Sequence, residues 1–320
     1  MNSEDFSRYV DRAMQGNDLD FVRPVVEKEL LHYEIFGALD EAGLLKNLVF
    51  QGGTSLRLCY GSQRFSEDLD FAGGKSFSAG NVREIKDCVE SRIGKRFGLD
   101  VTVREPKKES LGVVHVDKWL VSIQTSPGRA DLPRQKIKLE IANVPAHTRD
   151  ILPLRINYPV LIGRRQPLVA VESMDEILAD KLIALPMSIS RRTDGGMEYT
   201  PARIRHRDVW DIPWLVGQGA KLDVELVKKK IGDYGLQEFS TYLDWAVAAM
   251  PTISGSDAFR TQMARFLPQS RHGQVFSDAG YQGYLAKTIK GLLLDVREGL
   301  GAEVQKRQEA PKKSRRGPEL

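Results

Sequence analysis

The sequence has few of the features that mark secreted or membrane proteins. It contains two cysteines, Cys59 and Cys88, and no apolar run approaches the ~18 residues needed to span a bilayer. The N-terminal stretch MNSEDFSRYV is polar and acidic, unlike a secretory signal. Two scattered cysteines without an export signal indicate reduced thiols, with a single disulfide as the alternative. We therefore expect a cytoplasmic protein with no membrane partner.

Common catalytic motifs are missing too. The chain has no GxxxxGK[ST] phosphate-binding loop and no G-x-S-x-G nucleophile elbow, which argues against P-loop NTPases and α/β-hydrolases. Its two cysteines cannot form a zinc site by themselves. The histidines are scattered without metal-ligand spacing, at His32, His115, His147, His206 and His272.

The net charge of +4 comes from one end of the chain. Residues 305–320 contain six basic and two acidic side chains, whereas the other 304 residues hold 41 of each sign. The folded body is therefore neutral, and any nucleic-acid surface on it must be a local patch. The tail, rich in Pro, Lys and Arg, is predicted to be disordered, and it either binds nucleic acid or only aids solubility.

The first half of the chain mixes helical and strand patterns. In its clearest strand, 135–141, apolar residues alternate with charged ones, so that Glu140 lies on a polar face. A connector rich in Pro and Arg follows at 145–167. Further strands are predicted over 48–50, 69–71, 101–103, 119–123 and 168–171, and helices over 25–45, 54–60 and 78–97.

From about residue 170 the pattern becomes helical. Ser173 and Glu176 form a capping box that opens a helix running through Leu185. This change predicts an α/β (α+β) core over 1–170 and a helical C-terminal domain over 171–304, followed by the disordered tail over 305–320. Further helices are predicted over 201–216, 222–233, 236–249, 256–266 and 279–299.

A glycine pair marks the first candidate site. An apolar strand runs into Gly52-Gly53 and then into a helix, which exposes backbone N–H groups at the helix N-terminus. Glycine lets phosphate oxygens approach the backbone closely, and the helix dipole favours their negative charge. Thr54 and Ser55 add hydroxyl donors. Taken alone, the same residues also fit a plain turn.

Three acidic residues form the second candidate site. Asp68 and Asp70 lie two apart in a strand, so their carboxylates project from the same side and repel each other unless a cation lies between them. Oxygen ligands suit Mg²⁺ or Mn²⁺ rather than zinc. Glu140 supplies the third carboxylate that a pair of metal ions requires. Each acid alone also fits the solvated face of a strand.

The combination resembles a known superfamily. An apolar strand, Gly-Gly-Thr, Asp-x-Asp between apolar residues and a later strand with an apolar-flanked acid resemble the polymerase β-like nucleotidyltransferases. More specifically, GGTSLRLCYGSQRFSEDLDF is similar to the first two motifs of the AbiEii/AbiGii (MenT-like) nucleotidyltransferase toxins. An Arg-Phe-Ser-x-Asp-hydrophobic-Asp-Phe run is typical of that family. The resemblance implies a polymerase β-like core with a mixed sheet, joined to helices.

The resemblance continues to about residue 215. That family has a helix with a lysine and then a basic segment ending in Asp-x-x-Asp, which correspond here to Lys181 and to Asp208-Val-Trp-Asp211. Thr54 stands where many members have serine and keeps the hydroxyl. Glu140 replaces a commoner aspartate.

The resemblance implies a role for each group. Asp68, Asp70 and Glu140 would bind two Mg²⁺ ions, and Glu140 would deprotonate the acceptor hydroxyl. Lys181 would contact a triphosphate oxygen as a point charge, with Asp211 orienting it and Asp208 either assisting or binding a helix end. The nucleotide-binding set is Gly52, Gly53, Thr54, Ser55, Ser66 and Lys181.

Two features have open alternatives. In the family the position of Ser66 can be modified, so its hydroxyl is either regulatory or a hydrogen-bond partner in the turn before the strand. Arg203, Arg205 and Arg207 belong to the densest basic cluster of the folded body, which either receives an RNA backbone or forms a solvated helix face.

The implied activity is transfer of a nucleoside monophosphate from an NTP to an acceptor, with release of pyrophosphate. By resemblance the acceptor is the 3′ end of tRNA, and the consequence is blocked translation by the toxin of a toxin–antitoxin or phage-defence pair. A cognate antitoxin is then expected. The alternatives are a nucleotidyltransferase acting on a protein or small molecule, and a non-catalytic binding protein on the same scaffold.

Overall fold

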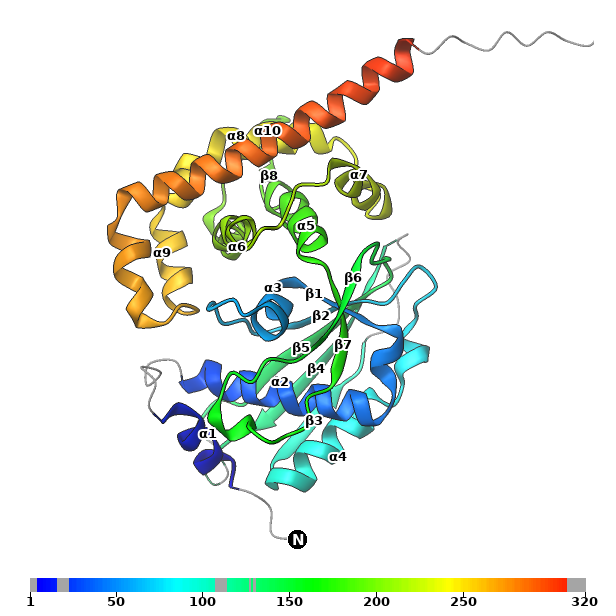
Figure 1. The fold of residues 1–320 in the computed structure, drawn as a ribbon, viewed down its shortest axis with the longest axis vertical. Coiled ribbons are helices and arrows are strands. Elements are labelled where there is room, and N and C mark those ends of the chain that lie inside the picture. Colours follow the sequence, from blue (N-terminus) through cyan, green and yellow to red (C-terminus); the bar gives the residue numbers. More distant parts are fainter. Residues whose placement is uncertain (1–4, 16–22, 107–113, 127, 129–130, 310–320) are drawn as a thin grey trace, which may run out of the picture.

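A computed structural model of the chain describes residues 5–15, 23–106, 114–126, 128 and 131–309. Figure 1 shows an α/β part that contains the N-terminal helices and the large sheet, and a helical part that lies above it. The connection between the two runs from the last strand of the sheet into helix α5 (Met174–Met187). The mixed α/β fold expected from the sequence is confirmed.

One sheet of seven strands forms the centre of the α/β part. Its spatial order is β3-β4-β5-β2-β1-β7-β6. The pairs β2–β5 and β1–β7 are parallel, and the other neighbours are antiparallel. The strands are β1 (Val49–Gln51), β2 (Leu69–Ala72), β3 (Asp100–Arg104), β4 (Val116–Gln124), β5 (Gln135–Ala142), β6 (Arg149–Pro153) and β7 (Leu168–Glu172).

Alternation along the strands gives the sheet one apolar face. In β5, Ile137, Leu139 and Ile141 are fully buried, whereas Lys136 and Lys138, which alternate with them, are exposed. Helices α1 (Phe6–Met14), α2 (Arg23–Glu41) and α4 (Ile85–Phe97) contribute to the core on the apolar face. The opposite face is left with polar and charged side chains.

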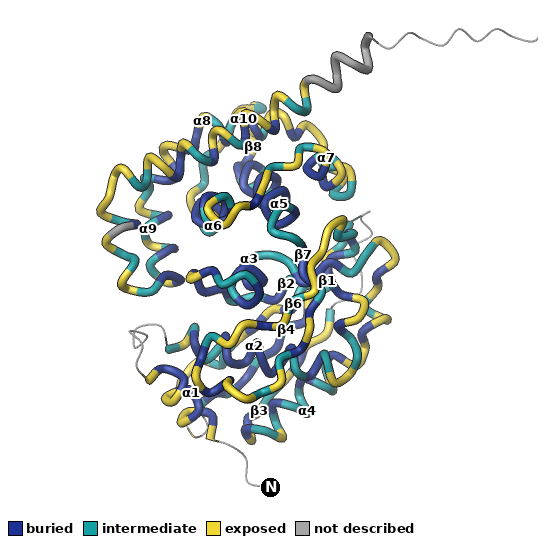
Figure 2. The backbone as a smooth tube through the Cα atoms, in the orientation of Figure 1, coloured by how far each residue is buried: buried dark blue, intermediate teal, exposed yellow. Residues whose placement is uncertain are grey.

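The helical part has its own core. Leu56, which follows the glycine turn, packs into this second cluster of buried residues. Figure 2 shows α5 as mostly buried, while exposed and buried residues alternate over residues 279–301 of the long outer helix α10 (Ala279–Glu309). The remaining helices are α6 (His206–Gly217), α7 (Val224–Asp233), α8 (Phe239–Ser254) and α9 (Asp257–Ala264), and a small hairpin pairs β8 (Ser190–Arg191) with β9 (Met197–Glu198).

Most predicted elements are present, with local differences. The connector at 145–167 contains strand β6, which its Pro and Arg content concealed because an edge strand tolerates both. The helix predicted over 78–97 is a 3₁₀ turn, Ala79–Val82, followed by α4. Helix α6 begins at His206, after a 3₁₀ turn over Pro201–Arg203.

The ends of two helices also differ from the prediction. Ser173 caps α5 by accepting from the Glu176 N–H, but the Glu176 carboxylate accepts from the N–H groups of His147 and Thr148, so only half of the capping box forms. Helix α10 continues to Glu309, into the predicted tail, and residues 310–320 lie outside the described residues. We keep the domain boundary near residue 170 as a proposal.

The two cysteine thiols are unpaired, as expected. Cys59 is buried and Cys88 is half-buried on α4. Over the part of the chain that the structure describes, no helix has both the length and the apolar character that crossing a bilayer requires.

Candidate active site

Two of the three predicted acids, Asp70 and Glu140, lie in a row of paired residues across the open face of the sheet. Asp70 on β2 pairs with Gln51 of β1 on one side and with Glu140 of β5 on the other. Glu140 in turn pairs with Lys118 of β4. Neighbouring strands are about 4.8 Å apart, so Asp70 and Glu140 stand side by side. The structure thus brings together two residues that are far apart in the sequence.

The glycine turn lets side chains approach closely. Gly52 has a φ of +77°, and a Cβ on it would lie 2.7 Å from Oδ2 of Asp70. A Cβ on Gly53 would collide with the Arg64 guanidinium. The pair opens helix α3 (Gly52–Ser55), which continues as the π-helical turn η3 (Leu56–Tyr60). The glycines therefore give Asp70 and Arg64 their positions beside the helix N-terminus.

The hydroxyls that follow the glycines bind within the protein. Thr54 Oγ1 donates to the carbonyl of Asp68, and Ser55 Oγ donates to the carbonyl of Gly52 at 2.7 Å. Ser66 is only 5% exposed and lies next to Gly53, so modification of its hydroxyl would require movement of the turn. In this structure the groups that the turn offers to a phosphate are its backbone N–H groups.

The three acids carry an excess of negative charge. Burial, then the charges of Glu140 and Asp68, raise the pKa of Asp70 to about 6. Two lysines partly balance the outer acids. Lys118 Nζ lies 3.1 Å from Oε1 of Glu140, and Lys138 Nζ lies 3.7 Å from Oδ2 of Asp68. Within the described residues no three such groups converge into a ready-made metal site.

A network of five charged residues, of which four are buried and Arg205 is exposed, joins the loop before β2 to helices α5 and α6. Lys181 on α5 donates to Oδ1 of Asp208 and Oδ2 of Asp211, both at 2.7 Å. Arg64 donates from Nε and Nη2 to the two oxygens of Asp211, each at 2.7 Å. Arg205 Nε donates to the other oxygen of Asp208 at 2.6 Å. We call Arg64, Lys181, Arg205, Asp208 and Asp211 the site network.

The site network holds its carboxylates ionised. The pKa values of Asp208 and Asp211 are lowered because the cations around them outweigh the opposing effect of burial. Three cations face two carboxylates, which leaves one positive charge. This positive charge lies near Asp70, and the Arg205 guanidinium partly offsets the rise in the pKa of Asp70.

Arg64 is a buried member of the site network that the sequence patterns did not single out. It is 2% exposed, and its bidentate contact with Asp211 links the loop before β2 to α6. A single arginine carries no spacing pattern of its own. Its only signal in the sequence is its place in the Arg-Phe-Ser run.

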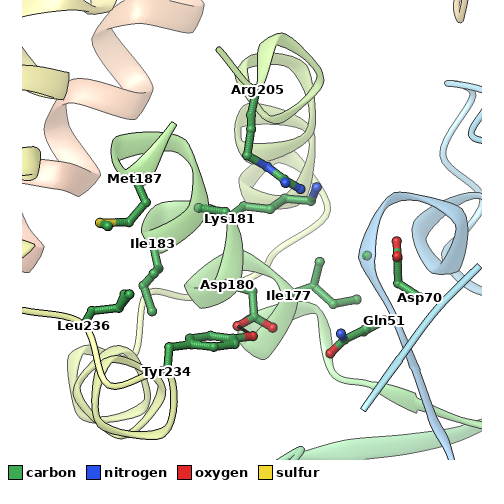
Figure 3. A pocket seen from close by; sticks show the side chains of 12 residues that line it. Gln51, Asp70, Ile177, Asp180, Lys181, Ile183, Met187, Arg205, Tyr234 and Leu236 are labelled. Atoms are coloured by element: carbon green, nitrogen blue, oxygen red, sulfur yellow. Dashed lines mark hydrogen bonds between the residues drawn. The ribbon is translucent and has the colours of Figure 1, made fainter. Parts of the chain in front are cut away.

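A pocket of about 390 Å³ lies between the acids and α5 (Figure 3). Gln51, Gly52 and Asp70 form one side of it, and Lys181 and Arg205 supply positive charge. Figure 3 shows Asp70 and Gln51 across the pocket from α5. The rest of the lining is mainly apolar, with two polar groups: Ile177, Asp180, Ile183, Ala184, Met187, Tyr234 and Leu236.

A second buried network borders the far side of this pocket. Lys230 of α7 is fully buried and lies 2.8, 2.6 and 3.0 Å from oxygens of Glu172, Glu176 and Asp180. Tyr234 donates to the other oxygen of Asp180 at 3.0 Å. Three acids share one ammonium, and burial raises the pKa of Glu172 well above its ordinary value. We call Lys230, Glu172, Glu176 and Asp180 the Lys230 network.

The three arginines predicted to bind RNA lie in and just before the first turn of α6, and their role in RNA binding stays a prediction. Arg205 lines the pocket and binds Asp208. The guanidinium of Arg207 lies 5.2 Å from the ring centre of Phe266. Arg203 is exposed in the turn before α6.

Comparisons with solved structures show the fold. The chain is similar to MenT4, a nucleotidyltransferase toxin of Mycobacterium tuberculosis, with 16% identity and a TM-score of 0.50, covering 92% of this chain and 100% of that one. JHP933 from Helicobacter pylori has 17% identity and a TM-score of 0.45 over 89% and 96% of the two chains. A putative nucleotidyltransferase from H. pylori has 21% identity and a TM-score of 0.46 over 87% and 97%.

Comparisons of sequence give the family. No curated protein matches the chain. The family model described as nucleotidyl transferase AbiEii toxin, type IV toxin–antitoxin system, matches residues 35–300, which is most of the chain. The glycine turn, the row of acids and the site network all lie within the matched residues. The chain therefore belongs to the AbiEii family of nucleotidyltransferase toxins.

Proposed function

We propose that this toxin transfers a nucleoside monophosphate from an NTP to the 3′ end of an RNA, with tRNA as the acceptor. The observation that carries the proposal is the pocket, in which Asp70 and the glycine turn face Lys181 and Arg205. A triphosphate needs backbone N–H groups, a cation site and positive charge around one small volume. The apolar remainder of the lining suits a base and ribose.

The acids fit a divalent cation. They offer carboxylate oxygens alone, and burial together with the neighbouring carboxylates of Glu140 and Asp68 raises the pKa of Asp70. The side chains of Asp68 and Glu140 are 29% and 23% exposed, which leaves them room to turn toward Asp70. Mg²⁺ or Mn²⁺ held by these three residues would neutralise phosphate charge and make the acceptor hydroxyl more acidic.

The residues of the chain supply the other steps. The acceptor hydroxyl oxygen forms a bond to the α-phosphorus, the bond to the β-phosphate oxygen breaks, and pyrophosphate leaves. Glu140 takes the proton of that hydroxyl. Two N–H groups of Lys181 bind Asp208 and Asp211, so its third can reach a phosphate oxygen in the pocket. Asp211 acts as a positioning residue for both Lys181 and Arg64.

In the cell this reaction would block translation, and the type IV toxin–antitoxin family implies a cognate antitoxin. The test is incubation with each labelled NTP and separate RNA, protein and small-molecule fractions. We expect label at tRNA 3′ ends, loss of labelling in EDTA and recovery with Mg²⁺ or Mn²⁺. Label that enters protein or a small molecule but never RNA would refute the RNA acceptor.

The matched variants are Asp70→Ala and Asp87→Ala. Asp87 is an exposed acid on α4, outside the site. Asp70→Ala should abolish transfer and toxicity in cells, whereas Asp87→Ala should retain both. Full toxicity of Asp70→Ala would refute the catalytic role.

A further inference from the structure

The open face of the sheet carries a patch of positive charge beside the acids. Four of its residues form what we call the basic face: Arg104 of β3, Lys118 of β4, and Lys136 and Lys138 of β5. The strand register joins them, since Leu120 pairs with both Arg104 and Lys138. Residues paired across neighbouring strands project from the same side, so all four lie on one face.

Two cations of the basic face and one cation beside it are paired with acids. Lys118 pairs with Glu140 and Lys138 with Asp68, and the neighbouring Arg134 pairs with Asp100 at 2.7 Å. Neither Arg104 nor Lys136 has an ion-pair partner among the described residues, and both are exposed. The side chains of Lys118 and Lys138 are 61% and 55% exposed. A clustered excess of exposed cations is the electrostatic mark of a polyanion surface.

The position of the patch relative to the pocket indicates what it would bind. Of the three residues paired across the sheet, Gln51 and Asp70 line the pocket, whereas Glu140 does not. The nucleotide therefore lies on the β1 side of Asp70. Glu140, the proposed base, faces the β5 and β4 side, and the acceptor hydroxyl has to arrive from there. The basic face begins at that point, because Lys118 and Lys138 contact Glu140 and Asp68.

We propose that the basic face over β3, β4 and β5 is the docking surface for the phosphate backbone of the acceptor RNA, whose 3′ hydroxyl it presents to Glu140. This inference rests on the proposed function and adds the surface that recognises the acceptor. Lysine and arginine contacts to phosphates give affinity without sequence readout and make binding depend on salt. Selection among RNAs would then come from other contacts.

The test uses two residues of the face that contact none of the acids. The full-length variant Arg104→Glu/Lys136→Glu is compared with Lys95→Glu/Lys290→Glu, which changes the charge equally at exposed sites on α4 and α10. Binding of deacylated total tRNA is measured over a salt series, and NTP binding is measured in parallel. We expect the first variant to bind tRNA at least ~10-fold more weakly, with a smaller salt slope, and to bind NTP normally.

The outcomes separate this inference from the proposed function. If the two variants bind tRNA with equal affinity, the basic face is not the docking surface for the acceptor RNA, even if the wild type transfers label to RNA. A wild type that binds tRNA through this face but never transfers label would refute the proposed function alone. If the glutamate variant does not fold, Arg104→Gln/Lys136→Gln provides the same comparison.

Discussion

Two ionic networks border the pocket, and they are built in opposite ways. In the site network, each oxygen of Asp208 and Asp211 has a cationic partner at 2.6–2.7 Å. In the Lys230 network, three carboxyl groups share one ammonium, and Oε2 of Glu172 has no hydrogen-bond partner in the described structure. The cations of the first network lower the pKa values of Asp208 and Asp211, whereas burial raises the pKa of Glu172 in the second.

The difference follows from what each network faces. The site network presents its surplus positive charge to the pocket and to Asp70 through Lys181 and Arg205. The Lys230 network connects β7, α5 and α7, and Asp180 is its one member that lines the pocket. Asp180 and Lys181 are neighbours in α5 and still belong to different networks, because successive residues of a helix point about 100° apart. We infer a role in substrate binding for the first network and a structural role for the second.

The largest effect on stability is expected at Lys230. Lys230→Met leaves Glu172, Glu176 and Asp180 without their ammonium, which should lower the free energy of unfolding by about 3–5 kcal/mol. The control is Lys229→Met, the exposed neighbour on α7, which should stay within about 0.5 kcal/mol of the wild type. Urea denaturation at pH 7 measures both. Equal stability of the two variants would remove the structural role of the network.

Asp211→Asn tests the site network. Loss of the shared carboxylate charge releases Arg64 and Lys181, so transfer activity should fall by about 100-fold, the scale of a lost electrostatic contact in an active site. The control is Asp244→Asn, which breaks an exposed ion pair with Arg297. Activity and NTP binding are measured for both. If Asp211→Asn lowers stability but leaves activity at the wild-type level, the network is structural like the other one.

Gly53→Ala displaces Arg64 without changing any charge. The added methyl group occupies the place of the guanidinium, so we expect a loss of about 1–3 kcal/mol in stability and a lower rate of transfer. The matched change is Gly232→Ala on α7, where nothing lies within 4 Å of the new methyl group, and which should stabilise by about 0.5–1 kcal/mol. Unchanged activity of Gly53→Ala would show that the position of Arg64 is not critical.

Glu172→Gln has an effect that depends on pH and is expected to be smallest near pH 4.5. The native pKa of Glu172 lies above its ordinary value of 4.5, so above pH 4.5 unfolding releases a proton and the wild type loses stability as pH rises. Glutamine does not titrate. The variant should match the wild type within about 1 kcal/mol near pH 4.5 and gain on it at higher pH, by at most ~1.4 kcal/mol per pH unit.

The control for this pH series is Glu225→Gln, an exposed acid on α7. Its difference from the wild type should stay constant between pH 5 and 8. A Glu172→Gln variant that instead becomes less stable with rising pH would show that Glu172 is ionised in the native protein.

Local patterns predicted much of the fold and part of the site. Alternation of apolar and charged residues placed β5, and spacing by two placed Asp68 and Asp70 on one side of a strand. Residues whose role depends on distant partners gave no such pattern. Arg64 and Asp211 are 147 residues apart, and the partners of Lys230 come from two other elements. Strand β6 was missed because its pairing with β7, rather than its composition, makes it a strand.

The sequence by itself determined the family, the mixed α/β class and the residue types available for phosphate and metal chemistry. These properties depend on residues that are close together in the sequence, so they can be recognised without a structure. Only the tertiary structure decided which groups meet. Strand register places Asp70 beside Glu140, and the packing of α5 against α6 lets Lys181 donate hydrogen bonds to Asp208 and Asp211. The same register places exposed cations of β3, β4 and β5 on one face of the sheet, although the folded part of the chain is neutral. The reason is that residues paired across neighbouring strands project from the same side.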